Sequence, residues 1–373
     1  MRTASIAFCI GARRFREIHF EKTILATVAG FTIAFGTVSS YSEMNGMDFD
    51  EFNETINADV TDRCDVSDLD VLAGRDLSEC DLAGANFSKP RREGQKRERT
   101  NLEGIILTNA NLEGANFNAV NLKGANLEGA NLSNANLALA DLERAVMNEA
   151  NLEGANLFRA RLTNTRLRKA DLTNANLNSS RLSGTNLTKA NLEGAQMKRA
   201  RMSNVVLMKA SLQRVNFAEA QMERVSPARA DLTDANFEGA SLTTSNMSGA
   251  NLTGVNFQDA ALSGVNLHKA NLESVDLTTA IFADNPKMSQ AILKGANLEN
   301  LDFTGINLWK ADLEGANLKN TNLSAADMER ANLRDADLEG ANLDAAILKD
   351  AVLEGANISA EQRDQACWSD CRD

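Results

Sequence analysis

The sequence is poor in the residues that fill an ordinary globular core. Aromatic residues make up 5% of the 373 residues, with one Tyr and two Trp, whereas a globular core of this size normally uses more large rings. Three Pro and 23 Gly exclude a collagen-like or low-complexity chain. Apolar residues, mostly Leu and Ala, still make up 43% of the chain. We therefore expect a core that is filled by small and aliphatic side chains.

Histidine and cysteine are also scarce, which argues against catalysis. His268 is the one His after the first 42 residues, so no second His is present to support a Ser-His-Asp arrangement in the body of the chain. No Cys/His cluster has the spacing of metal ligands, and no glycine-rich phosphate loop or dinucleotide fingerprint occurs. We predict that the protein is not an enzyme and uses neither a cofactor nor a metal.

The first 42 residues differ from the rest of the chain. They carry five basic and two acidic residues, a net charge of +3, whereas the remainder carries −15. Residues 23–38 are uncharged, and two small residues, Ser39 and Ser40, follow them. This order is typical of a cleaved secretory signal, and the apolar run is short for a membrane span. We expect an exported chain; a membrane tether through residues 23–38 and an incidental leader are the alternatives.

From Thr100 onward the chain repeats every five residues. Leu, Phe or Met recurs at the central position as far as Phe282, except at Pro227, and a small or β-branched residue lies two positions earlier. Five residues advance about 500° on an α-helix, and an odd period on a straight strand alternates between its faces. Neither element keeps the central residues on one side. A chain that turns a corner every five residues does, and the pattern therefore predicts a coiled shaft with these residues inside.

Charges spaced 20 residues apart indicate how many corners one coil has. Their signs alternate in the three series Glu103, Lys123, Glu143; Lys294, Glu314, Arg334, Glu354; and Glu299, Lys319, Glu339. If four pentapeptides make one coil, these residues stack on adjacent coils about 4.8 Å apart. Opposite charges then become neighbours, which is favourable. The series predict a four-sided coil of 20 residues.

The A-(N/D)-L-x-x pattern, as in Ala110-Asn111-Leu112-Glu113-Gly114, resembles the pentapeptide-repeat family over about 290 residues. The resemblance implies an all-β fold, a right-handed quadrilateral β-helix with Leu, Phe and small residues inside. We expect it to have short helical caps. The expected organisation is a leader or anchor at 1–42, an N-terminal cap at 43–71, the β-helix at 72–358 and a C-terminal cap helix at 359–373, with Ser359 as its N-cap.

Two interruptions of the repeat are expected. The segment 88–99 would place Arg92 and Arg97 at central positions, and burying two charges there would be costly. We therefore predict a looped-out insertion, whose six basic and two acidic residues make it either a solvated loop or a docking loop. The centres Phe282 and Leu293 are 11 residues apart instead of 10, which predicts a one-residue bulge near 285–290.

The cysteines outside the leader lie near the two ends of the repeat. If the chain is exported, Cys64–Cys80 and Cys367–Cys371 are plausible disulfides that staple the caps. Cys80 occupies the small inward position before Leu82. The alternative for Cys80 is therefore that it is a buried small residue.

The 20-residue spacing also reveals two series of like charges, which we name the basic stripes. They are Arg161, Arg181 and Arg201 on one side, and Lys169, Lys189, Lys209 and Arg229 on the next. Stacked like charges are unfavourable, so an acidic partner or a counterion could relieve them. The alternative is chance drift, compensated by flanking acids such as Glu193 and Glu219.

These observations favour a structural or protein-interaction solenoid with an unidentified protein partner, and the basic stripes suggest an acidic one. The net charge of −12 argues against direct nucleic-acid binding. The family resemblance implies two alternatives, a DNA-mimicking protein that binds gyrase and a protein of the thylakoid lumen. The leader and the basic stripes do not fit a DNA mimic, which needs a continuous negative face in the cytoplasm.

Overall fold

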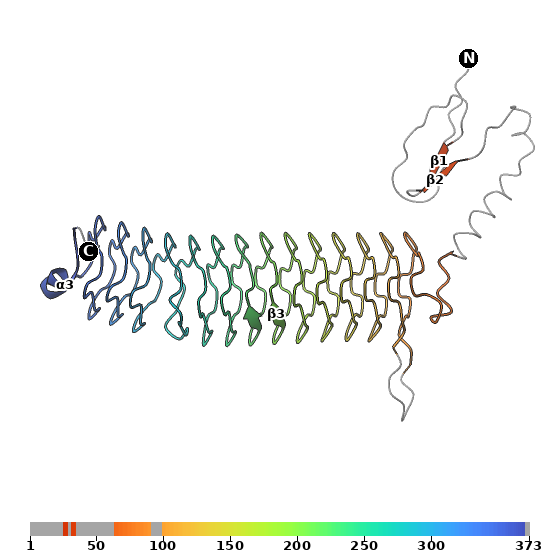
Figure 1. Ribbon diagram of the computed structural model, residues 1–373, viewed down its shortest axis with the longest axis horizontal. Coiled ribbons are helices and arrows are strands. Elements are labelled where there is room, and N and C mark those ends of the chain that lie inside the picture. The colour runs from red at the N-terminus through yellow and green to blue at the C-terminus, as the bar shows by residue number, and fades with distance from the viewer. Residues whose placement is uncertain (1–24, 29–30, 35–62, 91–98, 370–373) are drawn as a thin grey trace, which may run out of the picture. The chain divides into compact units, whose positions relative to one another are not determined.

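The computed structural model describes residues 25–28, 31–34, 63–90 and 99–369. The chain divides into two compact units, Met1–Arg63 and Cys64–Asp373. In the first unit, strands β1 (Leu25–Val28) and β2 (Phe31–Ala34) pair antiparallel within the predicted leader (Figure 1). Among the described residues, no helix has the length and apolar character needed to cross a membrane. Residues 43–62 of the predicted N-terminal cap lie outside the described residues.

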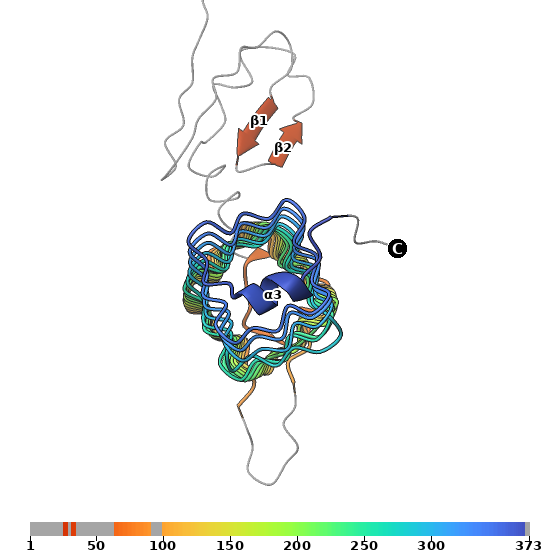
Figure 2. The same ribbon diagram turned by 90° about the vertical axis from the view of Figure 1, so that its left-hand side faces the viewer.

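The second unit is a four-sided coil (Figure 2). Parallel β-bridges join residues 20 apart on every side, which confirms the predicted coil length. Side 1 includes the bridge Asn101–Asn121, side 2 Ile106–Asn126, side 3 Asn111–Asn131 and side 4 Asn116–Asn136. Most bridges involve a single residue of each coil. In the described part of the coil they extend into strands on side 1 alone, where β3 (Arg201–Ser203) and β4 (Gln221–Glu223) pair in parallel.

The pentapeptide motif explains each corner. The backbone N–H of the central residue Leu112 donates to the carbonyl of Asn131 on the next coil, at 2.7 Å. The Asn111 side-chain oxygen accepts from the backbone N–H two residues later, as in an Asx-turn. The last residue, Gly114, has a φ of 64°, which a glycine adopts without strain. The central residue thus forms the bond to the next coil, the Asn stabilises the turn, and the Gly allows the left-handed corner.

The core is a single column of aliphatic and small side chains that runs along the axis. Central Leu and inward Ala residues are almost fully buried from Leu72 to Leu348. Some of the few rings stack on one another: Phe217 and Phe237 lie 4.9 Å apart between ring centroids, and Phe237 and Phe257 lie 5.4 Å apart. A narrow shaft needs few rings, and this accounts for the low aromatic content.

The structure locates the two interruptions. The bridges Asp76–Ile106, Asp81–Asn111 and Asn86–Asn116 join residues 30 apart, so ten extra residues leave the coil between Phe87 and Asn101. Residues 91–98 of this insertion lie outside the described residues. At the second interruption, the bridge Asn266–Lys287 spans 21 residues. Pro286 and Met288 are buried, so the single extra residue lies between Phe282 and Pro286.

The proline at a central position is tolerated because the five-residue repeat continues unchanged on both sides of it. Pro227 is buried like the residues that it replaces. It has no N–H to donate to the next coil, whereas its neighbour in the same column, Leu207, donates to Ser226 at 2.9 Å. The effect is the loss of one ladder bond.

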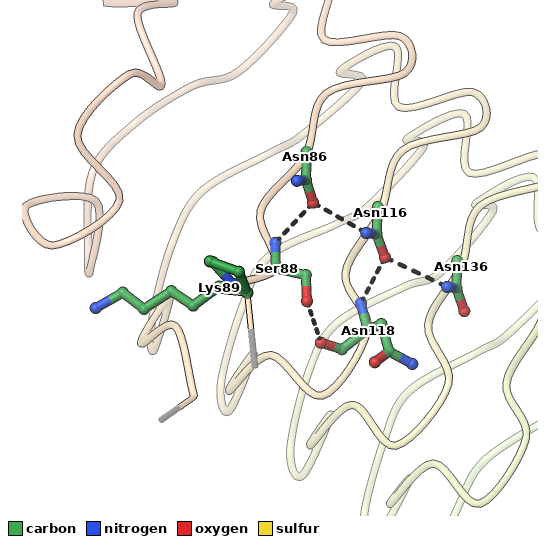
Figure 3. Close-up of a pocket in the computed structure, with 7 residues that line it drawn as sticks. Asn86, Ser88, Lys89, Asn116, Asn118 and Asn136 are labelled. Carbon is green, nitrogen blue, oxygen red and sulfur yellow. Dashed lines mark hydrogen bonds between the residues drawn. The ribbon is translucent and has the colours of Figure 1, made fainter. Parts of the chain in front are cut away.

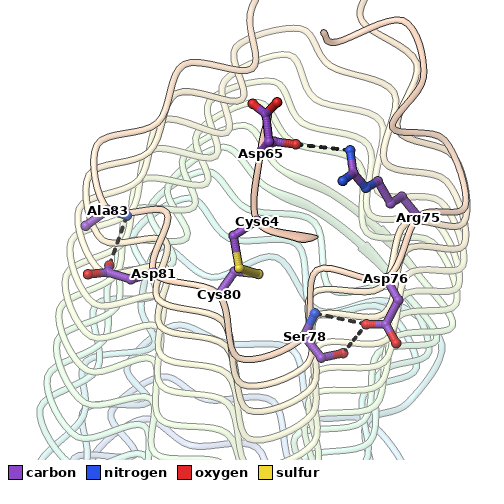
Figure 4. Close-up of a disulfide and its surroundings, with 8 residues drawn as sticks. All are labelled: Cys64, Asp65, Arg75, Asp76, Ser78, Cys80, Asp81 and Ala83. Atoms are coloured by element: carbon purple, nitrogen blue, oxygen red, sulfur yellow. Dashed lines mark hydrogen bonds between the residues drawn. A yellow bond between two sulfur atoms is a disulfide. The ribbon is translucent and has the colours of Figure 1, made fainter. Parts of the chain in front are cut away.

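Both ends of the coil are covered by specific contacts. Cys64 and Cys80 form a disulfide at the first coil (Figure 4), and Cys80 is both bonded and buried. At the other end, helix α3 (Ala360–Gln365) begins after Ser359, which forms a capping box with Gln362, and lies across the coil (Figure 2). Cys367 is also disulfide-bonded; Cys371, its expected partner, lies outside the described residues.

Candidate functional site: two basic stripes

The first basic stripe runs along side 1. Arg161, Arg181 and Arg201 are joined in order by parallel β-bridges, so the three guanidinium groups leave from equivalent positions on consecutive coils. All three residues are exposed. Their stacking puts like charges at directly neighbouring cross-strand positions, which is unfavourable.

The second basic stripe runs along the corner between sides 2 and 3. The backbone N–H of Lys169 donates to Thr188, that of Lys189 to Met208 and that of Lys209 to Ala228, each at 3.0–3.1 Å. These bonds hold the corner residues one coil apart, and Lys169, Lys189, Lys209 and Arg229 are all exposed. The structure therefore stacks each series as a column, with the two columns on different parts of the surface.

Both stripes are neutralised at the end nearer the N-terminus. Arg161 lies 3.4 Å from both Asp141 and Glu143, measured between side-chain nitrogen and oxygen. Lys169 pairs with Glu149 at 2.7 Å, and this hydrogen bond lowers the pKa of the Glu149 carboxyl. The acids that pair with these two stripe cations all belong to residues 141–149.

The remaining members of the stripes have no such partner. Within the described part of the chain, no carboxylate lies within 4.0 Å of a side-chain nitrogen of Arg181, Arg201, Lys189, Lys209 or Arg229. Glu193 binds Arg214 instead, and Glu219 binds Lys198 and Arg199. The flanking acids named in the sequence analysis are therefore engaged elsewhere and do not neutralise the stripes.

The corner stripe also occupies strained backbone positions. Lys169, Lys189, Lys209 and Arg229 have φ values of 57–60°, in the left-handed region that costs a residue with a Cβ about 1–2 kcal/mol. In the same column, the coil before this charged run has Glu149 and the coil after it has Gly249, and both residues also have a positive φ. Gly adopts this conformation with less strain, so each of the four cations has a local cost in stability, as do the other non-glycine residues at such corners.

The side 1 stripe replaces a stabilising ladder of amides. On sides 3 and 4, Asn side chains donate to the equivalent residue of the preceding coil, as in Asn131 to Asn111 at 3.1 Å and Asn136 to Asn116 at 3.3 Å. On side 1, within the described residues, these bonds occur only at Asn121, Asn322 and Asn342. Arginine has no acceptor and cannot continue such a ladder.

A shallow hollow at the root of the insertion is a second feature, which the sequence analysis did not anticipate (Figure 3). Its volume is about 450 Å³, and it is lined by Asn86, Ser88, Lys89, Pro90, Asn116, Asn118 and Asn136. The ladder amides Asn86, Asn116 and Asn136 already bond one another. Lys89 pairs with Asp70 at 2.5 Å. The polar lining is therefore engaged in structure, and the basic stripes remain the stronger candidate.

The rest of the described surface offers no catalytic or metal-binding cluster. His268 contacts Ser289 through Nδ1 at 2.8 Å, at an outward position as expected. Among the described residues, no three His, Cys, Asp or Glu side chains are grouped so that they could hold a metal ion. The charged pairs elsewhere include ladder pairs, such as Lys294–Glu314 at 3.1 Å and Arg334–Glu354 at 2.7 Å. These two pairs confirm the predicted stacking of opposite charges.

A model of the family described as pentapeptide repeats matches the chain in eight copies. They cover residues 98–134, 125–164, 135–174, 165–204, 210–249, 245–283, 291–330 and 326–359. The right-handed quadrilateral β-helix of this family is the fold observed here. No curated protein matches the chain.

Similar solved structures include three proteins. HetL, a pentapeptide repeat protein involved in heterocyst differentiation regulation in Nostoc sp. strain PCC 7120, is 29% identical over 75% of this chain and 88% of its own, with a TM-score of 0.23. A trypsin-treated variant of QnrB1, a plasmid-mediated fluoroquinolone resistance protein, is 19% identical over 56% of this chain and 89% of its own, with a TM-score of 0.21. A thylakoid-lumen pentapeptide repeat protein of Arabidopsis thaliana is 22% identical over 42% of this chain and 74% of its own, with a TM-score of 0.15.

Proposed function

Because the chain belongs to the pentapeptide repeat family, whose members are generally structural or interaction proteins, we propose that it is a non-enzymatic scaffold that binds an acidic protein partner along its two basic stripes. One observation carries this proposal. Cations stack on cations on consecutive coils, and on side 1 they stand where sides 3 and 4 have hydrogen-bonded amides, so stability is given up where positive charge is presented. Local choices that oppose the fold are typical of functional sites.

The physical gain from a partner is cumulative. A single exposed ion pair contributes about 0.2–1 kcal/mol. Five cations without a carboxylate partner, Arg181, Arg201, Lys189, Lys209 and Arg229, lie on consecutive coils in two columns, so a partner with several carboxylates engages the neighbours of a column together and removes their mutual repulsion. The backbone that carries them is already ordered, which reduces the entropy lost on binding.

The chemistry of the surface favours an acidic protein over a nucleic acid. The net charge of −12 repels a dense polyanion at long range. The stripe residues themselves include no aromatic side chain, and proteins that bind single strands use such rings to stack bases. A partner with a local acidic surface avoids both difficulties.

We further propose that the scaffold works outside the reducing cytosol, either exported or tethered to a membrane. The Cys64–Cys80 disulfide and the disulfide-bonded Cys367 support this proposal, because disulfides persist in oxidising compartments. Mass spectrometry of the protein from its native source tests it. A mature N-terminus near Tyr41 and oxidised cysteines are expected; an intact Met1 with reduced Cys64 and Cys80 contradicts the proposal.

Partner binding is tested by reversing charge on both stripes. The full chain and its Arg181→Glu/Lys189→Glu variant are immobilised, and captured proteins are quantified at low and high salt. We expect acidic proteins to be captured by the unchanged chain, to be released by salt and to be lost with the variant. Unchanged capture by the variant contradicts the proposal.

Arg159→Glu is the matched control for this experiment. Arg159 has a φ of 55°, like the corner stripe, and its guanidinium lies over the ring of Phe158. It occupies the corner diagonally opposite the corner stripe, two pentapeptides away along the coil, and lies two residues before Arg161, the end of the side 1 stripe that Asp141 and Glu143 already neutralise. This variant should capture the same proteins as the unchanged chain.

A further inference from the structure

We propose that the corner stripe continues to Lys310 as a basic lane whose partner is an extended acidic polypeptide segment. The inference rests on the proposed function and extends it in length and in the shape of the partner. The basic lane consists of Lys189, Lys209, Arg229, Lys269, Lys287 and Lys310. These six cations lie on seven consecutive coils, one on each coil except that of Gly249.

The coils keep the lane continuous. The corner N–H of Arg229 donates to Ser248, that of Gly249 to His268 and that of Lys269 to Ser289, at 2.8–3.1 Å. On side 2, parallel bridges join Asn266 to Lys287 and Lys287 to Asn307. The extra residue near 283–286 is therefore accommodated before the chain reaches side 2. The pairing of side 2 continues unchanged past the bulge, and so does the lane.

Side 2 and this corner contain no acid along the lane. The pentapeptides concerned are 165–169, 185–189, 205–209, 225–229, 245–249, 265–269, 286–290 and 306–310, and none of them contains Asp or Glu. The acids of side 3, such as Asp171 and Asp231, bond to Thr173 and Thr233. Positive charge is therefore segregated on a protein whose total charge is −12.

Internal ion pairs mark both ends of the lane. Before it, Lys169 is bound by Glu149 at 2.7 Å. After it, the corner cation Arg330 lies 3.7 Å from Glu329 and 3.5 Å from Asp350. Between these points, within the described residues, no carboxylate lies within 4.0 Å of a lane cation. The paired cations Lys169 and Arg330 therefore mark where the lane begins and ends.

The spacing of the cations identifies the partner. Six coil steps at about 4.8 Å give a lane of about 29 Å, with one cation per about 6 Å. Duplex DNA carries one charge per about 1.7 Å of axis, and each of its strands one per about 3.4 Å. An extended polypeptide with an acid at every second residue presents one carboxylate per about 6.6 Å on one face. The lane therefore matches a polypeptide of about nine residues.

Apolar side chains within the lane support the same choice. Met208 lies beside Lys209 and is 42% exposed. Trp309 is half-buried, and the Lys310 ammonium lies 4.4 Å from the centroid of its ring. Apolar residues of a polypeptide would gain contact area at both positions, whereas a sulfated polysaccharide gains nothing there.

Fluorescence anisotropy with the full chain tests the inference. The probes are labelled peptides of alternating Glu and Thr, about four, eight and twelve residues long, measured at low salt. Affinity is expected to increase up to about nine residues and then to level off, because the lane ends. Lys269→Gln and Lys310→Gln should each weaken binding of the longest peptide about two- to fivefold, whereas Arg159→Gln should not change it.

The outcomes separate this inference from the proposed function. If Arg181→Glu/Lys189→Glu abolishes binding but Lys269→Gln and Lys310→Gln do not weaken it, the lane is wrong and the proposed function stands. Tighter binding of oligodeoxythymidylate or of a sulfated polysaccharide, with affinity that keeps increasing with length, overturns the polypeptide assignment. If the unchanged chain binds none of the acidic peptides, both proposals fail.

Discussion

Arg181 and Arg201 are bridged partners on adjacent coils, two like charges at positions where sides 3 and 4 have hydrogen-bonded amides. This arrangement is unfavourable for the fold by itself. It implies that the stability of the coil and the charge of the stripe oppose each other, and the opposition can be measured.

Restoring the amide ladder should stabilise the protein and weaken partner binding. We expect Arg181→Asn/Arg201→Asn to increase the free energy of unfolding by about 0.5–1.5 kcal/mol, because the two amides can form one ladder hydrogen bond with each other, whereas Arg161 on the preceding coil offers no acceptor. Thermal or denaturant unfolding measures the change. The control is Asn136→Arg on side 4, which removes bonds of the ladder and should destabilise. A less stable double variant would contradict this account of the stripe.

Reducing the Cys64–Cys80 disulfide should destabilise the start of the coil. The bond closes a loop with a sequence separation of 16, and a loop of this length contributes about 3 kcal/mol in the chain-entropy model. Hydrogen exchange of the Cys64→Ser/Cys80→Ser variant should show lost protection around Leu77 and Leu82, with the coils beyond Leu102 unchanged. Equal protection in both proteins would show that the disulfide does not hold this end.

The C-terminal helix should keep coils from associating end to end. The buried Gln362 amide donates to the carbonyls of Leu338 and Ala341, at 2.8 Å each, and an uncovered sheet edge is a site for pairing. A chain shortened after Asn357 is expected to form dimers or larger assemblies in analytical ultracentrifugation. Gln362→Leu, which keeps the helix, is the control. It should be less stable than the unchanged chain but have the same oligomeric state. If the shortened chain also keeps the oligomeric state of the unchanged chain, the helix does not prevent end-to-end association.

The Lys169–Glu149 pair should be visible in the acid titration of the protein. The hydrogen bond from Lys169 lowers the pKa of Glu149 below its ordinary value of 4.5. A carboxyl with a lowered pKa stabilises the fold above its ordinary pKa, and this contribution is lost as the pH falls through the lowered value. NMR titration should therefore find Glu149 below 4.5, and Lys169→Gln should raise it. A value at or above 4.5 in the unchanged protein would show that the pair does not form.

Much of this structure could be predicted from the sequence, because a period of five admits one consistent geometry. Leu and Ala at fixed positions predict the filled shaft, and the alternation Lys294, Glu314, Arg334 predicts coils of 20 residues. The ladder pairs follow from the 20-residue spacing, but the pairs of Glu193 and Glu219 could not be predicted, since a surface acid has several cations within reach. Glu193, for example, binds Arg214 on the next coil and leaves the basic stripes alone. The contacts of Gln362 depend on how α3 lies across the coil end, which the repeat does not specify.

The most direct test of the basic stripes is the affinity of the full chain for an acidic peptide, measured with and without Arg181→Glu/Lys189→Glu over a range of salt concentrations. We predict binding that weakens as salt increases, because exposed charges are screened, and loss of binding in the variant while Arg159→Glu binds normally. Binding that is equal in the unchanged chain and in the Arg181→Glu/Lys189→Glu variant at every salt concentration would contradict the account.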